Sequence, residues 1–568
     1  MRFVLLLLLM ESSRAEAQGQ EFTYATNNGT ITLKTYTGGG GNVSIPEMIN
    51  GLAVTAIDDY MMWGWFPLTV ASVVTIPKSV TNIGSYAFYD FPGLFSISID
   101  PANPAYSSLD GVLFNKLQTT LFRFPSGKPG PYQIPASVTN IGPIAFTGCS
   151  DLFNVTIPDS VVFIERAPAG LNGVGAFSSS DLTSLTIPAS ITNIPDYLFA
   201  GASLQQVALP AGLSSISSGA FWGCASLTSV IFPTNLTSIE RDAFSLCSSL
   251  SAITIPDSVT NIGSGAFGYC SSLAQIKIPG RVSSIGSWPF YSCTNLGSIT
   301  VDMANSVYVS IDGVLFDKSQ NTLIQYPGGK PGTYAIPDGV ANIADLAFYN
   351  SAKMTAISIP SSVTSIGLNA FNSCASLTMV VLPDKLTFLN NWTFGYCWSL
   401  TNVTLPKSLT AIGTEAFYDC RSLTSVTIPG TVTNIGNWAF DTCYNLTAVY
   451  FEGNAPTLEP SVFWADPNAT VYYLPDTTGW GPTFGDRPTA LWNPQANTMD
   501  GNFGVRLNRF GFNVSGTTNI PLVIEASTNL APQSWIPVQS CTLTNGLIYF
   551  KDPQWTNHLR RFYRIRSP

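Results

Sequence analysis

The chain has 568 residues and a net charge of −9, with 10% charged and 45% apolar residues. This composition is too apolar for a disordered chain, and its negative charge makes nucleic acid a poor partner. His558 is the only histidine, which excludes zinc sites built from several histidines and leaves a single candidate for a Ser-His-Asp triad. We therefore expect no catalytic residues, no metal site and no cofactor.

Residues 1–17 have the features of an export signal. Arg2 precedes a short apolar run at residues 3–10, and Ala15-Glu16-Ala17 fits a cleavage site before Gln18. The run is too short to anchor the chain in a bilayer, and no other apolar run is long enough for a membrane helix. The segment predicts a secreted or cell-surface protein without a transmembrane span.

Residues 18–72 are expected to form an N-terminal strand segment and a capping repeat. Residues 22–41 alternate apolar and polar side chains and end in four glycines, and residues 43–57 contain a degenerate repeat. An atypical repeat is typical of the end of a stacked array, where it covers the core.

Residues 73–451 carry a repeat of mostly 22 or 23 residues. Residues 225–247, 248–270 and 271–293 follow the template L-x-x-V-x-I-P-x-x-(V/L)-x-x-I-x-x-x-A-F-x-x-C, with exchanges such as Phe232 for Ile and Pro289 for Ala. A period of this length indicates a solenoid, because one repeat cannot bury its apolar side chains until its neighbours stack on it.

Within one repeat, the L-x-x-V-x-I part predicts a short strand. Leu250, Ile253 and Ile255 should point inward, whereas Ala252 and Thr254 should point outward. The proline that follows ends the strand because it has no N–H for the next one. The Ala-Phe pair should turn back across the core, with the ring filling the interior.

Two longer units interrupt the array near residues 99–135 and 301–337. They lie 202 residues apart, so that Gly111 matches Gly313 and Lys128 matches Lys330, which indicates a duplicated block. Asp-Gly in each predicts a tight turn between two strands. We expect two or three extra strands in each insert and a plain turn at each Gly-Lys-Pro-Gly tip, and a loop at residues 165–172.

The array weakens after residue 446. Residues 452–494 are rich in Pro, Gly, Trp and Tyr and are expected to form a C-terminal cap and linker over the last open edge. Residues 495–568 contain several short alternating segments separated by turns, which predict a small β-sandwich.

Nine of the ten cysteines recur at the end of repeats and none forms a C-x-x-C pair, which argues against zinc. Neighbouring repeats could bring these cysteines within reach of a disulfide, and an exported protein could oxidise them. The favoured alternative is a ladder of buried thiols that pack and bond to the neighbouring backbone.

The best candidates for a binding face are residues that depart from the repeat. The outward strand positions are mostly Ser, Thr and Asn. Exceptions are Gln206, Gln275, Lys277, Met379, Val381 and Tyr450. Aromatic residues also occur two positions before the repeated Phe, at Tyr86, Trp288, Trp392 and Trp438. These rings could stack on sugars or anchor a protein, although packing between repeats also explains them.

Paired carboxylates could make a glycosidase, but the acidic residues show no repeated pairing. They occupy variable turn positions, at Glu240, Asp242, Asp257, Asp384 and Glu415. Solvated turns are the favoured interpretation, and a surface position is the favoured one for His558.

The motif I-P-x-S-V-x-x-I-G-x-x-A-F-x-x-C-x-S-L resembles the BspA-type class of bacterial leucine-rich repeats over residues 43–449. The resemblance implies a mainly β fold, a curved leucine-rich-repeat solenoid with a parallel sheet on one face. It also implies a surface or secreted protein associated with adhesion and protein binding. Residues 450–456, the ATVYYLP segment and the tail ending in RRFYRIR resemble C-terminal parts of exported proteins of environmental bacteria, which implies no particular activity.

Two functions remain open. The first is an exported, non-enzymatic scaffold that binds a protein or mediates adhesion. The alternative is a carbohydrate-binding or polysaccharide-associated surface protein. In both, the partner is a protein or glycan on a cell surface or in the extracellular matrix; a hydrolase is a poor third hypothesis.

Overall fold

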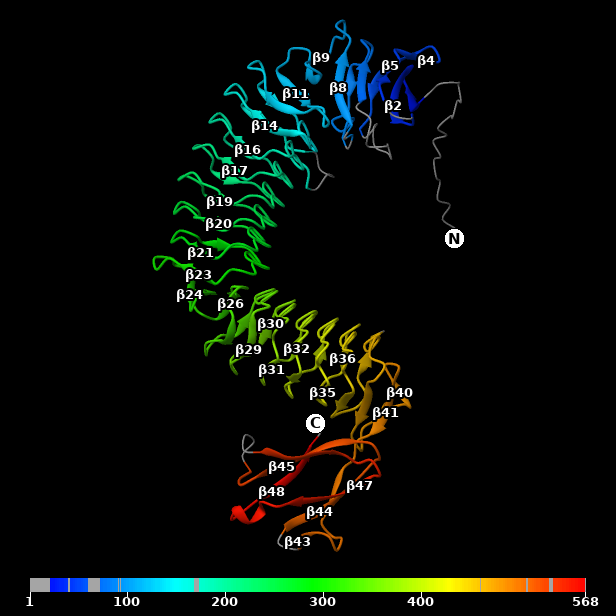
Figure 1. The fold of residues 1–568 in the computed structure, drawn as a ribbon, viewed down its shortest axis with the longest axis vertical. Coiled ribbons are helices and arrows are strands. Elements are labelled where there is room, and N and C mark those ends of the chain that lie inside the picture. The colour runs from blue at the N-terminus through cyan, green and yellow to red at the C-terminus, as the bar shows by residue number, and fades with distance from the viewer. Residues whose placement is uncertain are drawn as a thin grey trace, which may run out of the picture. The chain divides into compact units, whose positions relative to one another are not determined.

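The computed structural model describes residues 21–38, 41–59, 72–89, 91, 93–167, 173–459, 461–506, 509–530 and 535–566. The chain divides into two compact units, Met1–Asp312 and Gly313–Pro568. Short strands stack on one another within each unit (Figure 1). The described residues contain no α-helix and one 3-10 turn, η2 (Trp555–Asn557). The predicted signal segment and most of the loop expected at residues 165–172 lie outside these ranges.

The L-x-x-V-x-I segments form the first sheet. In the first unit its strands are β3 (Val43–Ser44), β6 (Ser72–Ile76), β8 (Leu94–Ile99), β12 (Gly130–Gln133), β14 (Leu152–Thr156), β16 (Ser184–Thr186), β17 (Gln206–Ala208), β21 (Gln275–Ile278) and β23 (Ser298–Val301). In the second unit they are β27 (Gly332–Ala335), β29 (Met354–Ser358), β31 (Met379–Val381), β33 (Asn402–Thr404), β35 (Ser425–Ile428), β37 (Ala448–Phe451), β39 (Thr470–Tyr473) and β41 (Arg487–Leu491). Paired neighbours in this sheet run parallel, as predicted.

A second parallel sheet runs along each unit, built around the Ile or Leu that lies six residues after the proline position. In the first unit it contains β7 (Asn82–Ile83), β13 (Asn140–Ile141), β15 (Phe163–Ile164), β18 (Ser215–Ile216), β19 (Ser238–Ile239), β20 (Asn261–Ile262) and β22 (Ser284–Ile285). In the second it contains β28 (Asn342–Ile343), β30 (Ser365–Ile366), β32 (Phe388–Leu389), β34 (Ala411–Ile412), β36 (Asn434–Ile435) and β38 (Thr457–Leu458). The register between consecutive rungs is one repeat, as in Ile239 opposite Ile262.

The third side of each rung, which we call the turn side, is the segment around Ala-Phe. Its backbone takes a left-handed conformation two residues before and two residues after the Phe, with φ of 63° at Gly265 and 56° at Tyr269. The N–H groups of Gly265, Phe267 and Tyr269 all donate to carbonyls of the next rung, at 2.8–3.0 Å. In this rung, as in most others, three hydrogen bonds hold the turn side to its neighbour, although it is not a strand.

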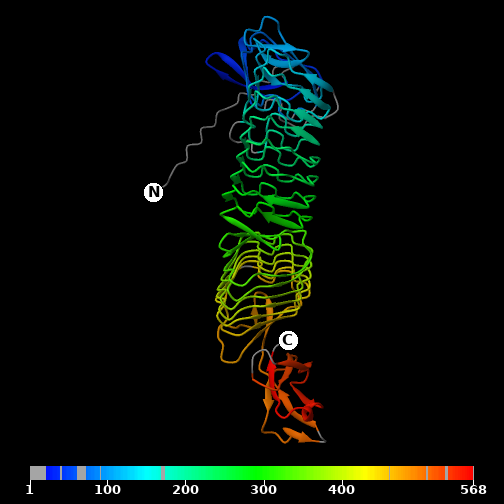
Figure 2. The same ribbon diagram turned by 90° about the vertical axis from the view of Figure 1, so that its left-hand side faces the viewer.

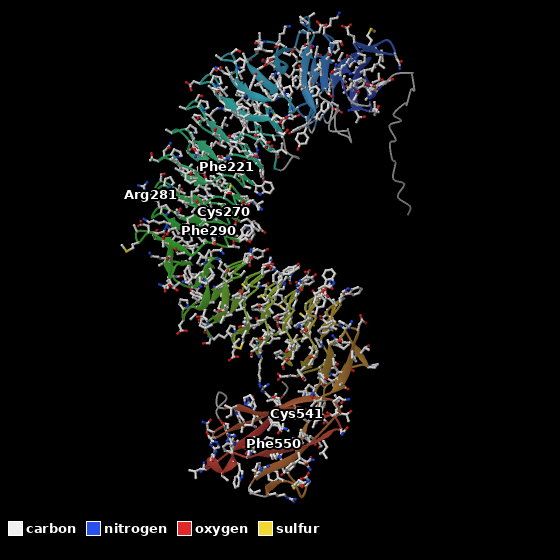
Figure 3. The ribbon with its side chains drawn as sticks, in the orientation of Figure 1. Phe221, Cys270, Arg281, Phe290, Cys541 and Phe550 are labelled. Carbon is white, nitrogen blue, oxygen red and sulfur yellow. The ribbon has the colours of Figure 1, made fainter. Side chains whose placement is uncertain are left out.

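The repeated Phe side chains form a stack inside each unit. Phe221, Phe244 and Phe267 are fully buried, with ring centroids 5.0 and 5.6 Å apart and planes within 5° of parallel. Figure 3 shows Phe221 and Phe290 inside the first unit and Arg281 pointing outward. Side-on, the coils of the second unit lie one above another (Figure 2), and its Phe residues stack in the same way.

The predicted alternation along a strand is confirmed. Leu250, Ile253 and Ile255 are buried, while Ala252 and Thr254 are exposed. The core is therefore a continuous column of aliphatic and Phe side chains between the two sheets and the turn side, without a larger globular centre.

The two inserts add strands as expected. The first contributes β9 (Tyr106–Leu109), β10 (Val112–Asn115) and β11 (Thr120–Arg123) before β12 rejoins the first sheet. Asp110 and Gly111 have φ of 50° and 75° and join β9 to its antiparallel partner β10, which is the two-residue turn that Asp-Gly favours. The second insert repeats these strands 202 residues later, as β24 (Tyr308–Ile311), β25 (Val314–Asp317) and β26 (Thr322–Gln325). Each Gly-Lys-Pro-Gly tip is a hydrogen-bonded turn, with Lys128 N–H donating to the Pro125 carbonyl.

The N-terminal segment adds β1 (Phe22–Asn27), β2 (Thr30–Tyr36), β4 (Met48–Ile49) and β5 (Leu52–Ile57) to the first end of the array. β2 and β5 run parallel, and β5 pairs with β7, so this segment continues the second sheet. Its side chains share one apolar cluster with the first clear repeats, which agrees with a capping role.

At the other end, the expected cap extends the first sheet. β39 and β41 add two parallel strands beyond β37, and β40 (Thr483–Phe484) folds back on β41. A C-terminal module follows with two antiparallel sheets. One contains β42 (Gln495–Asn497), β43 (Gly504–Arg506), β44 (Arg509–Ser515) and β47 (Leu547–Asp552); the other contains β45 (Pro521–Ser527), β46 (Ile536–Thr542) and β48 (Phe562–Arg566). Side chains of both sheets meet in one buried cluster.

Replacing Phe267 by Ala is expected to lower the free energy of unfolding by about 3–5 kcal/mol, because a fully buried ring is removed from the stack and leaves a cavity. Denaturant titration followed by circular dichroism measures the change. Thr254→Ala, at an exposed position of the same rung, is the control and should alter stability by less than about 0.5 kcal/mol. Equal stability of Phe267→Ala and wild type would contradict the packing of this ring.

Candidate functional site

The sheet face, defined as the outward side of the first-sheet strands, carries five exposed residues of the predicted set, including Val381. Gln206, Gln275 and Lys277 in the first unit and Met379 in the second are all exposed. Gln275 and Lys277 are neighbours on β21, and the Lys277 ammonium lies 2.9 Å from Asp302. Gln206 lies on β17, three repeats earlier in the chain, so the structure does not gather these residues into one site.

Tyr450 also points outward from β37, as predicted, but it is not exposed. Only 4% of its surface is accessible, because the C-terminal module covers the sheet face over the last rungs. Its ring stacks on Tyr472 at 5.0 Å and meets Trp492 edge-on at 6.2 Å. Trp492 in turn donates a hydrogen bond to the Pro521 carbonyl of the module. Tyr450 is therefore removed from the exposed binding face.

The aromatic residues two positions before the Phe differ in exposure. Tyr86 is buried, with 5% of its surface accessible and its ring edge-on to Tyr89, so its expected place on a binding face is corrected. Trp288 and Trp392 are half-buried, and Trp438 is exposed. These residues lie on the turn side and the Gln and Met residues on the sheet face, so the two predicted sets occupy different faces.

The backbone conformation two residues before the repeated Phe explains why both Gly and Trp occur at this turn-side position. Trp288, Trp392 and Trp438 have φ of 44°, 58° and 53°, the same left-handed conformation that Gly265 adopts. The conformation is disfavoured for bulky residues, but it lets the N–H of Trp392 donate to Thr414 in the next rung. The backbone constrains φ at this position and leaves the side chain free to vary.

Around Trp392 the second unit gathers several rings on its turn side. Trp392 stacks on Tyr396 with centroids 5.7 Å apart and contacts Tyr418 at 5.3 Å, and the two tyrosines meet edge-on. The sequence pattern singled out Trp392, but it did not show that rings at two other positions of the repeat join it, since those positions alternate with Gly and Asp in neighbouring rungs.

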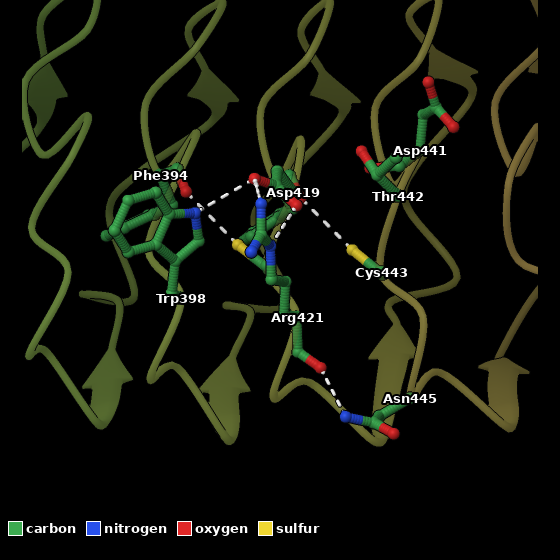
Figure 4. A network of polar contacts seen from close by, with 10 residues as sticks. Phe394, Trp398, Asp419, Arg421, Asp441, Thr442, Cys443 and Asn445 are labelled. Atoms are coloured by element: carbon green, nitrogen blue, oxygen red, sulfur yellow. Dashed lines mark hydrogen bonds and ion pairs between the residues drawn. The ribbon is translucent and has the colours of Figure 1, made fainter.

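A polar network that the sequence analysis did not predict joins Trp398, Asp419 and Arg421, which lie beside the repeat cysteines of two successive rungs (Figure 4). The buried Asp419 carboxylate accepts hydrogen bonds from the Trp398 indole N–H at 2.9 Å and from Arg421 at 2.7 and 2.9 Å. The Arg421 guanidinium lies over the Trp398 ring at 5.2 Å. Because Trp398 and Arg421 follow the repeat cysteine of successive rungs, where Ser and Ala are otherwise common, only a three-dimensional register brings them together.

The cysteines form the expected ladder of buried thiols. All ten are free, and nine are buried. Cys247 donates its S–H to the carbonyl of Phe221 in the preceding rung at 3.1 Å, and Cys270 does the same to Phe244 at 3.2 Å. Burial raises the pKa of the Cys224 thiol to about 12, so these sulfurs are neutral packing groups and not nucleophiles.

The last rung departs from the ladder, because Asp466 occupies the position where nine other rungs carry cysteine. Its side chain is buried, and burial and the neighbouring Asp441 carboxylate raise its pKa to about 7, although Arg487 opposes the shift. Burial and Asp441 also raise the pKa of Glu415, one of the scattered carboxylates.

Within the described ranges, no three His, Cys, Asp or Glu side chains come close enough to hold a metal ion. No helix in that part of the chain is long and apolar enough to cross a membrane. The features that the described residues offer to a partner are Ser- and Thr-rich strands with isolated apolar side chains, a turn side with clustered rings, and a cavity beside Tyr450.

This geometry defines a class of protein: a repeat solenoid with two parallel sheets and a hydrogen-bonded turn side. The model of the BspA type leucine rich repeat region matches six copies over residues 56–129, 130–168, 173–297 and 341–470, which is more than half of the chain. The chain belongs to this family, and the predicted family and fold class are confirmed.

The chain is also similar to bacterial proteins of known structure. A leucine rich cell surface protein of Faecalibacterium prausnitzii is 28% identical, with 76% of this chain and 94% of that one covered and a TM-score of 0.39. A leucine-rich repeat protein of Bacteroides ovatus is 26% identical over 72% and 94% of the chains, with a TM-score of 0.38. The pneumococcal vaccine antigen PcpA is 17% identical over 81% and 93%, with a TM-score of 0.41. No curated protein matches the chain.

Titration with a thiol reagent tests the ladder. The native protein should react quickly at about one site, Cys541, which is only half-buried, while the unfolded protein should expose all ten thiols. Fewer than ten thiols after unfolding without reductant would show disulfides between rungs and would contradict the ladder.

Asp466 should make stability depend on pH. Its folded pKa of about 7 lies above the ordinary value of about 3.9, so the folded state holds a proton that the unfolded state has lost between those pH values. The contribution of Asp466 to stability should therefore be greatest below about pH 4 and fall as the pH rises to about 7. Asp466→Cys, which continues the ladder, should remove this dependence and stabilise the protein at pH 8 by at most about 4 kcal/mol.

Thermal unfolding of both proteins at several pH values measures this difference. Asp384→Asn, at an exposed turn, is the control and should keep the wild-type profile. If Asp466→Cys and wild type change in parallel with pH, Asp466 does not titrate as its burial indicates.

Proposed function

We propose that the chain is an exported, non-enzymatic scaffold that binds a protein partner through the sheet face of its repeats. Export is supported by residues 1–17, which have the pattern of a cleaved signal. Binding is supported by the fold, because a solenoid presents a long, regular surface whose outward positions vary without disturbing the core.

The main support for the proposal is a pair of exposed apolar residues on β31. On β31 the outward residues Met379 and Val381 expose 54% and 55% of their surface, although both neighbouring strands of this face carry small or polar residues. Both are aligned with Asn402 and Thr404 of the next strand. An apolar pair surrounded by polar residues is the usual composition of a protein-binding centre and its rim. The partner we expect is an extracellular protein that presents an apolar side chain.

A double substitution tests this face. Met379→Asp with Val381→Asp places two charges at the centre of the patch and should weaken partner binding at least about tenfold, because a buried charge without a partner is costly. Both side chains point to solvent, so the array should remain folded. Chemical crosslinking of the full mature chain to extracellular protein, followed by mass spectrometry, identifies the partner. The affinity of each variant is then measured with the purified partner.

Phe388→Asp is the matched control. Phe388 is similarly exposed but lies on β32 in the second sheet, so its substitution should leave the affinity unchanged. Equal binding by the double variant and wild type, or failure of any extracellular protein to bind, would refute a protein-binding sheet face.

The second candidate function is glycan binding on the turn side. The cluster of Trp392, Tyr396 and Tyr418 supports it, because contiguous rings can stack on sugar faces. Sugar binding that Trp392→Ala abolishes would favour this function.

A further inference from the structure

A cavity of about 200 Å³ lies in the second unit, between the last rungs of the array and the C-terminal module. Its walls combine strands that are far apart in sequence: β35, β37 and β39 of the array and β48 at the end of the chain. Residues that line it include Thr427, Tyr450, Tyr472, Trp492 and Arg566.

The array side of the cavity is built by register. Thr427 lies beside Tyr450, and Tyr450 beside Tyr472, in one row of the first sheet. Tyr450 and Tyr472 stack, and Trp492 closes the row edge-on. The cavity therefore has an aromatic wall of three rings whose position is determined by backbone pairing.

One polar group in this wall has no use within the protein. The Tyr450 hydroxyl is buried and has no hydrogen-bond partner among the described residues, which is costly for a buried polar atom. Tyrosine side chains buried in cores usually donate their O–H to a neighbour. A molecule in the cavity that carries a hydroxyl would satisfy it.

The charges at the cavity favour a neutral ligand. Glu452 is exposed at its lining and supplies a carboxylate acceptor. Arg566 also lines it, and its Nε lies 2.6 Å from the Glu525 carboxylate, which Arg564 binds as well. Glu452 and Glu525 carry two negative charges and Arg564 and Arg566 carry two positive charges, so the site has no net charge with which to attract an ion.

From these observations we infer that the cavity is a binding site for one neutral, hydroxyl-bearing ring, and that the ligand class is a single sugar residue. The rings of Tyr450, Tyr472 and Trp492 would contact the apolar face of the sugar, while Tyr450 and Glu452 would bond to its hydroxyls. The volume is below the about 300–1,000 Å³ of sites for drug-sized ligands, which suits one ring and not a long chain. This inference does not rest on the protein-binding sheet face or on the turn-side rings.

The test uses the full mature chain and three probes: methyl β-glucopyranoside, methyl β-galactopyranoside and N-acetylglucosamine. Ligand-detected NMR and calorimetry, at probe concentrations up to about 20 mM, should show binding of at least one, with Kd near about 1 mM. Tyr450→Phe removes only the unpartnered hydroxyl and should weaken binding about fivefold. Glu452→Gln should weaken it as well.

Tyr444→Phe is the matched control, since it makes the same chemical change at an exposed tyrosine away from the cavity. It should bind the sugar as wild type does. The melting temperature of ligand-free Tyr450→Phe should equal or exceed that of wild type, which separates a lost contact from a damaged fold.

Several results would overturn the inference. Binding of no probe would show that the cavity holds solvent only. Binding that both Tyr450→Phe and Glu452→Gln leave unchanged, or that only Trp392→Ala abolishes, would place the sugar elsewhere. Binding of N-acetyltyrosinamide in place of the sugars would show that the cavity receives a side chain of a protein.

Discussion

The stacking of the turn side is the constraint on which the rest of this structure depends. A non-strand backbone can stack at one rung per repeat only if its N–H groups point along the array, and the two left-handed residues that flank most of the repeated Phe residues achieve this. The small Ala before the Phe permits the close approach, the Phe fills the space between the sheets, and the Cys bonds to the preceding Phe carbonyl. These three residues recur because one hydrogen-bond pattern recurs.

The same constraint divides the positions of each repeat into those that the fold requires and those whose side chains are available for binding. Packing in the core constrains the residue type at the inward positions and at the repeated Ala, Phe and Cys. At the outward strand positions and the left-handed positions the side chain can vary. The exposed Met379 and Val381 occupy outward strand positions, and Trp392, Tyr396 and Asp419 occupy left-handed positions. Both candidate faces can therefore change without loss of the fold, which is what a binding scaffold requires.

The two ends of the array break the pattern for a physical reason. A parallel sheet that stops abruptly leaves unpaired backbone groups, so the chain adds strands β39 and β41 and then covers the sheet face with the C-terminal module. At this end the repeat chemistry changes: Asp466 replaces a cysteine, and outward tyrosines become core residues. The cavity beside Tyr450 is a product of that closure, because it exists only where two differently built surfaces meet.

The sequence by itself determined the repeat, its parallel sheet, the inward and outward positions of residues such as Ile253 and Thr254, the inserted turns at Asp-Gly and the thiol ladder. Each of these depends on contacts between equivalent residues one period apart, and the period is visible in the chain. Only the tertiary structure decided that Tyr86 and Tyr450 are buried, that Trp392 lies among Tyr396 and Tyr418, and that Trp398 and Arg421 share Asp419. These outcomes depend on the module that covers the last rungs or on side chains at non-equivalent positions, and no periodic pattern encodes such contacts.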